Sequence, residues 1–188
     1  MQWYLHSQDQ FGRVLTEVAA DQWGNPTPCT QWTVRDIAGH VVWGLDLLRT
    51  WCGGTDFENR VGAPGAARPG DYLGTDPVAD WERARTASAR TLTPDSLAVV
   101  VPTRTRGPMR VGDLMAALTV DFLTHTWDLG QAIGMRVRLD PAAIEYAQRW
   151  ADTHIDAVRS PEMFGPALAA PAQADPQTRL LRYLGRSA

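Results

Sequence analysis

The sequence contains no lysine, and all 18 of its basic residues are arginines. Without lysine the chain can form no Schiff base with a carbonyl substrate and can supply no P-loop lysine to a nucleotide phosphate. Only two cysteines, Cys29 and Cys52, occur in 188 residues, which excludes a disulfide scaffold and favours thiols in the cytosolic, reduced state. Neither cysteine has a neighbouring base in the sequence, so we interpret both as structural thiols.

Long apolar runs and an excess of positive charge are also absent. No run approaches the length of a membrane span, and the N-terminus lacks the basic and apolar regions of a signal peptide. The net charge of -3 gives no sign of the excess positive charge that binding to DNA or RNA requires. We therefore expect a cytoplasmic protein that binds neither membranes nor nucleic acids, folded as a single domain over residues 1–188.

Hydrophobic residues recur at helical spacing through most of the chain, which predicts an all-α fold. Thr33 with Asp36 three residues later indicates a capped helix start, and Asp-Pro pairs at 76–77 and 140–141 indicate two more. Together these patterns predict helices over residues 1–20, 34–52, 76–91, 112–134, 140–159 and 177–184.

Three segments do not fit this helical pattern. Residues 53–75 are rich in glycine and proline, and they form either a wall or lid over the mouth of a helix bundle or a simple crossover between helices. Thr93 to Asp95 is expected to be a turn. The β-branched run 97–101 is expected to pair with residues 109–111 as a small hairpin before the fourth helix. Residues 161–176 are rich in proline and alanine, which predicts an extended segment.

The strongest chemical pattern lies in the predicted helix over 112–134. Asp121 and His125 are four residues apart and therefore share one face, which is otherwise apolar. A carboxylate is costly to bury unless it is paired or binds a metal. On the helix over 34–52, His40 stands at the edge of the core stripe. Two imidazoles and one carboxylate would form a three-ligand site with open positions, typical of catalytic zinc or non-haem iron. The alternative is a buried hydrogen-bonded Asp121–His125 pair and a core histidine.

Four other polar residues are weaker candidates for a site. Arg104, Arg106 and Arg110 cluster before the fourth helix, where guanidinium groups would suit an anionic small-molecule substrate; the alternative is a solvated loop. Asp128 lies just beyond the rim of the stripe that carries Asp121, where it could orient a ligand imidazole.

Two of these segments resemble a known family. The segment Trp32–His40 (WTVRDIAGH) and the segment Asp121–Leu129 (DFLTHTWDL) are similar to the ligand motifs of DinB-like metal-binding four-helix bundles. The branch they resemble most is the N-terminal domain of mycothiol-dependent maleylpyruvate isomerase. The segments 27–32 (TPCTQW) and 164–185 resemble an actinobacterial subfamily of metal-binding proteins.

The resemblance implies a four-helix bundle with long crossovers, a hairpin before the fourth helix and an extra C-terminal helix. It implies zinc or nickel bound by His40, Asp121 and His125, and a low-molecular-weight thiol such as mycothiol as cosubstrate in isomerase or S-transferase chemistry. Asp121 replaces the glutamate of the isomerase pattern, and we expect no separate C-terminal domain of the isomerase type. Two other functions stay open: a non-enzymatic metal- or ligand-binding module, and a thiol-independent hydrolase, cyclase or epimerase. A homodimer is compatible with a bundle of this size.

Overall fold

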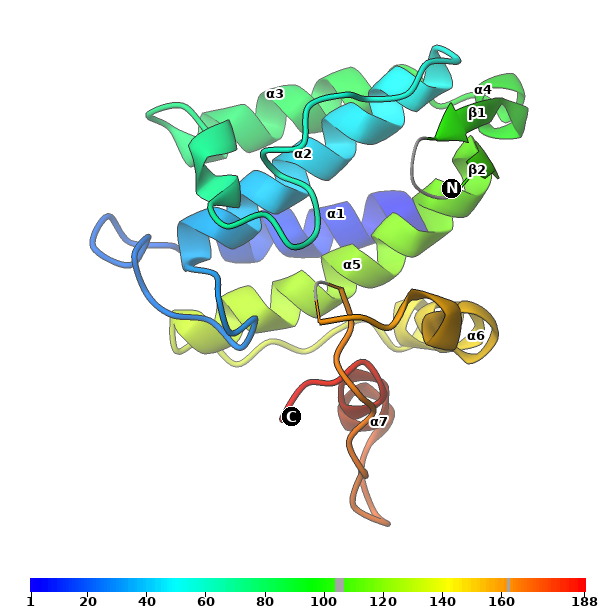
Figure 1. Ribbon diagram of the computed structural model, residues 1–188. Coiled ribbons are helices and arrows are strands. Elements are labelled where there is room, and N and C mark those ends of the chain that lie inside the picture. The colour runs from blue at the N-terminus through cyan, green and yellow to red at the C-terminus, as the bar shows by residue number, and fades with distance from the viewer. Residues whose placement is uncertain (104–106, 162) are drawn as a thin grey trace.

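The computed structural model describes residues 1–103, 107–161 and 163–188, and its fold is all-α, as predicted (Figure 1). Figure 1 shows α2 and α3 above α1 and α5, with α1 packed on α5 and α2 packed on both α3 and α5. These four helices form the bundle: α1 (Gln2–Leu15), α2 (Val34–Cys52), α3 (Pro77–Ala89) and α5 (Val111–Ala132). No helix within the described residues is both long enough and apolar enough to cross a membrane.

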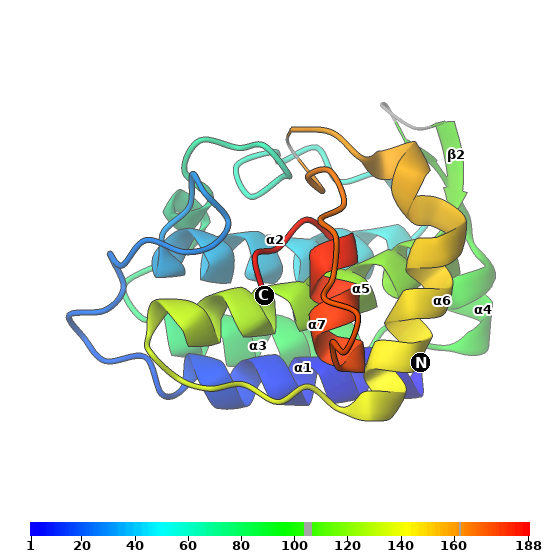
Figure 2. The ribbon, with the colours of Figure 1, turned by 90° about the horizontal axis from the view of Figure 1, so that it is seen from below.

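Two further helices cross the bundle beside α5. Figure 2 shows α6 (Pro141–Val158) and α7 (Pro176–Tyr183) running across the direction of α5, with α6 against α5 and α7 against α6. The Gln177 side chain ties α7 to the segment before α6, because it accepts from Leu139 N (2.8 Å) and donates to Val137 O (3.1 Å). The predicted C-terminal helix is therefore confirmed.

Local capping explains where the helices begin. The Thr33 hydroxyl accepts from the Asp36 amide, and the Asp36 carboxylate accepts from the Thr33 amide, which confirms the predicted capping box of α2. Asp76 and Asp140 likewise accept from amides of the first turns of α3 and α6. Each of these two helices has proline at its first position, where no amide donor is needed.

The hairpin before α5 is present, but its strand bounds, the predicted turn at 93–95 and the end of the first helix differ from the prediction. β1 (Val100–Thr103) pairs antiparallel with β2 (Gly107–Arg110), and Val101 lies opposite Met109, so the strands are shifted from the expected 97–101 and 109–111. The predicted turn at 93–95 instead begins a short helix, α4 (Pro94–Ala98), because Thr93 and Ser96 cap it reciprocally. The first helix ends at Leu15 instead of near residue 20, and the chain then continues through turns.

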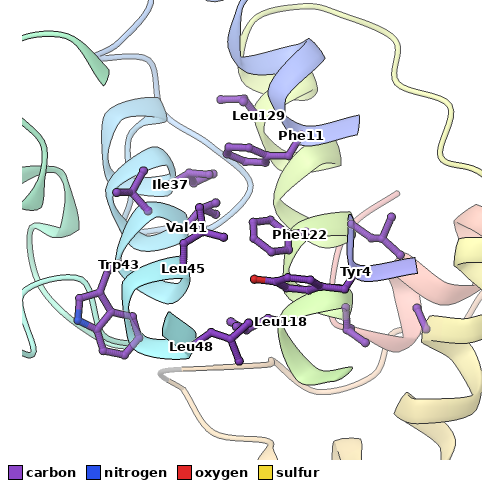
Figure 3. Close-up of a cluster of buried hydrophobic side chains, with 14 of the residues drawn as sticks. Tyr4, Phe11, Ile37, Val41, Trp43, Leu45, Leu48, Leu118, Phe122 and Leu129 are labelled. Atoms are coloured by element: carbon purple, nitrogen blue, oxygen red, sulfur yellow. The ribbon is translucent and has the colours of Figure 1, made fainter. Parts of the chain in front are cut away.

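The core lies between α1, α2 and α5. In Figure 3, Tyr4 and Phe11 of α1 point toward Phe122 of α5, and Val41 and Leu45 of α2 face them. The Tyr4 and Phe122 rings meet at 5.6 Å between centroids, and Phe11 and Phe122 at 6.1 Å. Edge-to-face contacts of this kind favour one arrangement of the rings. This packing fixes α5 against α2, the two helices that carry the predicted ligands.

The crossover from α2 to α3 runs back along α2 and includes the 3-10 turn η1 (Pro69–Tyr72). Indole nitrogens hold it in place: Trp43 donates to Asn59 O (2.7 Å) and Trp32 donates to Ala66 O (2.9 Å). At Gly39 a side-chain Cβ would lie 2.1 Å from the carbonyl oxygen of Pro69, so only glycine allows this approach. The glycine- and proline-rich segment is therefore a wall packed on α2.

Candidate functional site

Three of the predicted site residues converge between α2 and α5. His40 Nε2 lies 3.2 Å from one carboxylate oxygen of Asp121, and His125 Nε2 lies 3.4 Å from the other. One ligand atom from each residue lies within 4.8 Å of the others. The two histidines are buried, whereas the Asp121 side chain keeps 23% of its surface exposed. The carboxylate therefore stands between two imidazoles and also reaches accessible space.

The far nitrogen of each imidazole is anchored by an acceptor. His40 Nδ1 donates to the carbonyl oxygen of Gly62 (2.7 Å), and His125 Nδ1 donates to Asp128 Oδ2 (3.0 Å). Because a carbonyl or an ionised carboxylate can only accept, both Nδ1 atoms must carry hydrogen. In the neutral ring this places the remaining lone pair on Nε2, on the side that faces Asp121, where a metal ion could accept it; this is the tautomer that metal-binding histidines adopt.

Asp128 is completely buried, and a residue from the C-terminal end of the chain neutralises it. Arg186 donates from Nε to Asp128 Oδ1 and from a terminal nitrogen to Oδ2, both at 2.8 Å. This fork-like pairing is the strong form of an arginine–carboxylate contact. Sequence reasoning missed Arg186, because nothing in the local pattern distinguishes it from the chain's other arginines.

The charges in the site favour an ionised carboxylate on Asp121 and a protonated imidazole on His125. Burial alone would raise the pKa of Asp121, but the two imidazoles hold it well below its usual range. Burial would likewise lower the pKa of His125, but the carboxylates of Asp121 and Asp128 raise it to about 9. Burial would also raise the pKa of Asp128, which Arg186 and His125 keep below its usual range. A divalent cation would take the place of the proton that His125 shares with Asp121.

A cavity of about 330 Å³ opens onto this cluster. Trp32 forms one wall, with its ring centroid 4.8 Å from that of His40 and 5.9 Å from that of His125. Three segments far apart in the sequence complete the lining: residues 29–31, Pro64 with Gly65, and Pro161 with Met163 and Phe164. The crossover and the segment after α6 thus contribute walls to one small-molecule-sized space.

Cys29, which the sequence indicated as a structural thiol, also lines this cavity. Burial raises its pKa to about 11, although the nearby Arg186 guanidinium acts in the opposite direction. At neutral pH the side chain is therefore a thiol and a weak nucleophile.

The structure separates the remaining predicted residues from the cavity or leaves them undescribed. Arg110 is exposed at the N-cap of α5, eleven residues before Asp121, which corresponds to about 16 Å along a helix axis. Arg104 and Arg106 lie outside the described residues. Trp43 stacks against His40 with ring centroids 6.2 Å apart, and Trp127 is buried; neither is among the residues that line the cavity.

Most of the chain matches a known protein family. A model of the mycothiol maleylpyruvate isomerase N-terminal domain matches residues 4–130. The chain belongs to this family. The match includes His40, Asp121, His125 and Asp128, whereas Arg186 and the cavity wall formed by Pro161, Met163 and Phe164 lie beyond it. Membership confirms the resemblance found in the two helix motifs and places the protein in a mycothiol-related, metal-binding family.

Similar sequences extend over nearly the whole chain. Uncharacterized proteins from two strains of Mycobacterium tuberculosis are 29% identical over 190 residues, covering 98% of this chain and 96% of theirs. No solved structure matches the chain at a significant level. The similarity therefore includes the segments beyond residue 130, as well as the family domain.

Proposed function

We propose that this protein binds a divalent transition metal, zinc or nickel, through His40, Asp121 and His125, and acts on a low-molecular-weight thiol such as mycothiol. The observation that carries the proposal is the convergence of two Nε2 atoms and one carboxylate on one point, with both Nδ1 atoms anchored. Two nitrogens and one oxygen suit zinc or nickel, and three protein ligands leave a position for substrate.

The cavity beside the candidate ligands favours an enzyme, of isomerase or S-transferase type, rather than a structural metal site in which protein ligands fill every position. A bound divalent ion would supply a Lewis acid that favours the thiolate form of a thiol substrate. The chain's own residues would do the rest. Trp32 and Phe164 would exclude water from the reacting atoms, and Thr30 and Gln31 offer polar side chains to the body of the substrate.

The choice of a thiol rests on the family and on the volume of the site. The family takes its description from a mycothiol-dependent isomerase domain, and the cavity is large enough to hold a small molecule beside the ligands. Cys29 would remain a protonated wall residue, so the reacting sulfur would come from the cosubstrate.

Metal content measured by elemental mass spectrometry tests the first half of the proposal. We expect near-stoichiometric zinc or nickel in the wild type and in His154→Ala, which removes an exposed histidine of α6, and background metal in His125→Ala. A wild type that neither retains nor takes up either metal would overturn the proposal. The second half is tested by adding mycothiol to the cobalt-substituted protein, where sulfur binding should produce a charge-transfer band. An unchanged spectrum would show that the thiol does not bind the metal and would overturn this half of the proposal.

A further inference from the structure

Arg186 connects the end of the chain to the candidate ligands. It lies after α7, 58 residues from Asp128 in sequence and outside the part of the chain that the family model matches. Only 7% of its surface is exposed, and Asp128 is fully buried. A buried ion pair of this kind costs desolvation energy, so its presence directly behind a ligand histidine calls for an explanation.

We propose that Arg186 is a positioning residue for the metal ligands and acts through Asp128. This inference rests on the proposed function, since it assumes that His125 binds a metal. Asp128 Oδ2 is shared between His125 Nδ1 and a terminal nitrogen of Arg186, while Oδ1 is held by Arg186 Nε. The two parallel bonds fix the plane of the carboxylate, and the carboxylate in turn fixes the orientation of the imidazole.

Loss of Arg186 would disturb His125 without touching it. A fully buried Asp128 without its cation would have to take up a proton, rotate or admit water. Each of these changes would alter the acceptor that holds His125 Nδ1 and would misdirect Nε2. Outer partners of this type contribute roughly 10- to 100-fold to metal affinity.

The same local structure that places Arg186 also places a wall of the cavity. Arg159 donates to the carbonyl oxygens of both Gly165 and Tyr183, and Gly185, at φ +86°, packs directly on Gly165. Phe164, which lines the cavity, is thereby tied to the turn that carries Arg186. Metal binding and docking of the C-terminal segment should therefore stabilise each other by the same factor, as linkage requires.

A double-mutant cycle on zinc affinity tests the inference. Zinc dissociation constants would be measured by chelator competition for the wild type, Asp128→Ala, Arg186→Ala and the double variant. Arg182→Ala is the matched control, because the Arg182 side chain on α7 donates to the carbonyl oxygens of Ala169 and Ala188, which are not part of the candidate site. We expect each single variant to lose roughly 10- to 100-fold, the double variant to lose no more than Asp128→Ala, and the control to match wild type.

Two results would overturn the inference while leaving the proposed function intact. One is Arg186→Ala binding zinc as tightly as the control, and the other is losses that multiply in the double variant. A wild type that binds neither zinc nor nickel would instead overturn the proposed function. If Arg186→Ala does not fold, the coupling is tested instead by measuring hydrogen exchange in the wild-type protein with and without zinc. Zinc should slow exchange at the hydrogen-bonded amides of Leu184, Gly185 and Arg186, and unchanged exchange there would refute the coupling.

Discussion

The Nδ1 atom of His40 lies 2.7 Å from the carbonyl oxygen of Gly62, a residue of the crossover that follows α2. This contact makes the crossover part of the candidate site, because it selects the tautomer of His40. Gly62 reaches this position only because it has no side chain, since a Cβ there would lie 2.2 Å from the Cβ of Trp43. One glycine thus joins the packing of the wall to the orientation of a candidate ligand.

The substitution Gly62→Ala should weaken metal binding although it adds only a methyl group. The clash with Trp43 would push the crossover away from α2 and remove the acceptor of His40 Nδ1. We expect roughly 10- to 100-fold weaker zinc binding and a loss of about 1–3 kcal/mol in the free energy of unfolding. Chelator competition and urea denaturation would measure both. Gly24→Ala is the control, because a Cβ there meets nothing within 4 Å; equal zinc affinity in the two variants would contradict the argument.

The charge and the length of the side chain at residue 121 should have separate effects on metal content. Asp121→Asn keeps the size of the side chain but removes the negative charge between the two imidazoles, so metal content should fall to background. Asp121→Glu keeps the charge on a side chain one methylene longer, and the partly exposed position leaves room for it, so this variant should retain metal. Elemental analysis of both variants beside wild type checks the prediction. Full metal content in Asp121→Asn would show that the carboxylate is not a ligand.

Zinc should cancel the contribution of His125 to the pH dependence of stability. In the metal-free protein the pKa of His125 is raised from 6.5 to about 9. A raised pKa in the folded state stabilises the fold fully below pH 6.5, and this contribution is lost as pH rises through about 9. Zinc must displace that proton, so its apparent affinity should rise by about tenfold per pH unit in this window.

Thermal denaturation with and without zinc at several pH values between 6.5 and 8.5 would measure this effect. The increase in Tm caused by zinc should grow with pH, while the Tm of the metal-free protein changes in the opposite direction. A zinc-induced shift that is the same at all pH values would show that no proton is exchanged for the metal.

The Cys29 thiol should resist alkylation. With a pKa of about 11, roughly one molecule in a thousand carries the thiolate at pH 8. In a Cys52→Ser background, which leaves Cys29 as the single cysteine, iodoacetamide should react roughly 100-fold more slowly with folded than with guanidinium-unfolded protein. A folded-state rate within tenfold of the unfolded rate would mean that the site activates this cysteine.

Residues close together in the sequence carried most of the successful predictions. The capping pair Thr33 and Asp36 marks the start of α2, and the Asp-Pro pairs mark the starts of α3 and α6. Asp121 and His125 share a face because they are four residues apart on one helix, so their proximity follows from helix geometry alone. The convergence of His40 with them follows from the apolar stripes that pack α2 against α5.

Contacts between distant residues could not be predicted from the chain. Gly62 is 22 residues from His40, and Arg186 is 58 residues from Asp128, and both belong to segments without hydrophobic periodicity. Such segments are placed by where the crossovers leave and rejoin the helices, which no local pattern encodes. The short helix α4 was missed for a different reason, because its capping box uses Ser96 where an acidic residue is usual.

The candidate ligands and the cavity walls occupy different kinds of structure. His40, Asp121 and His125 project from two long helices whose positions are set by the core, whereas Phe164 and its neighbours come from an irregular segment beyond the family match. Replacements in that segment can reshape the space above the ligands while the donor atoms stay in place. If these three residues bind the metal, relatives that keep them are free to diverge in the substrate they accept, and selectivity can evolve without rebuilding the candidate metal site.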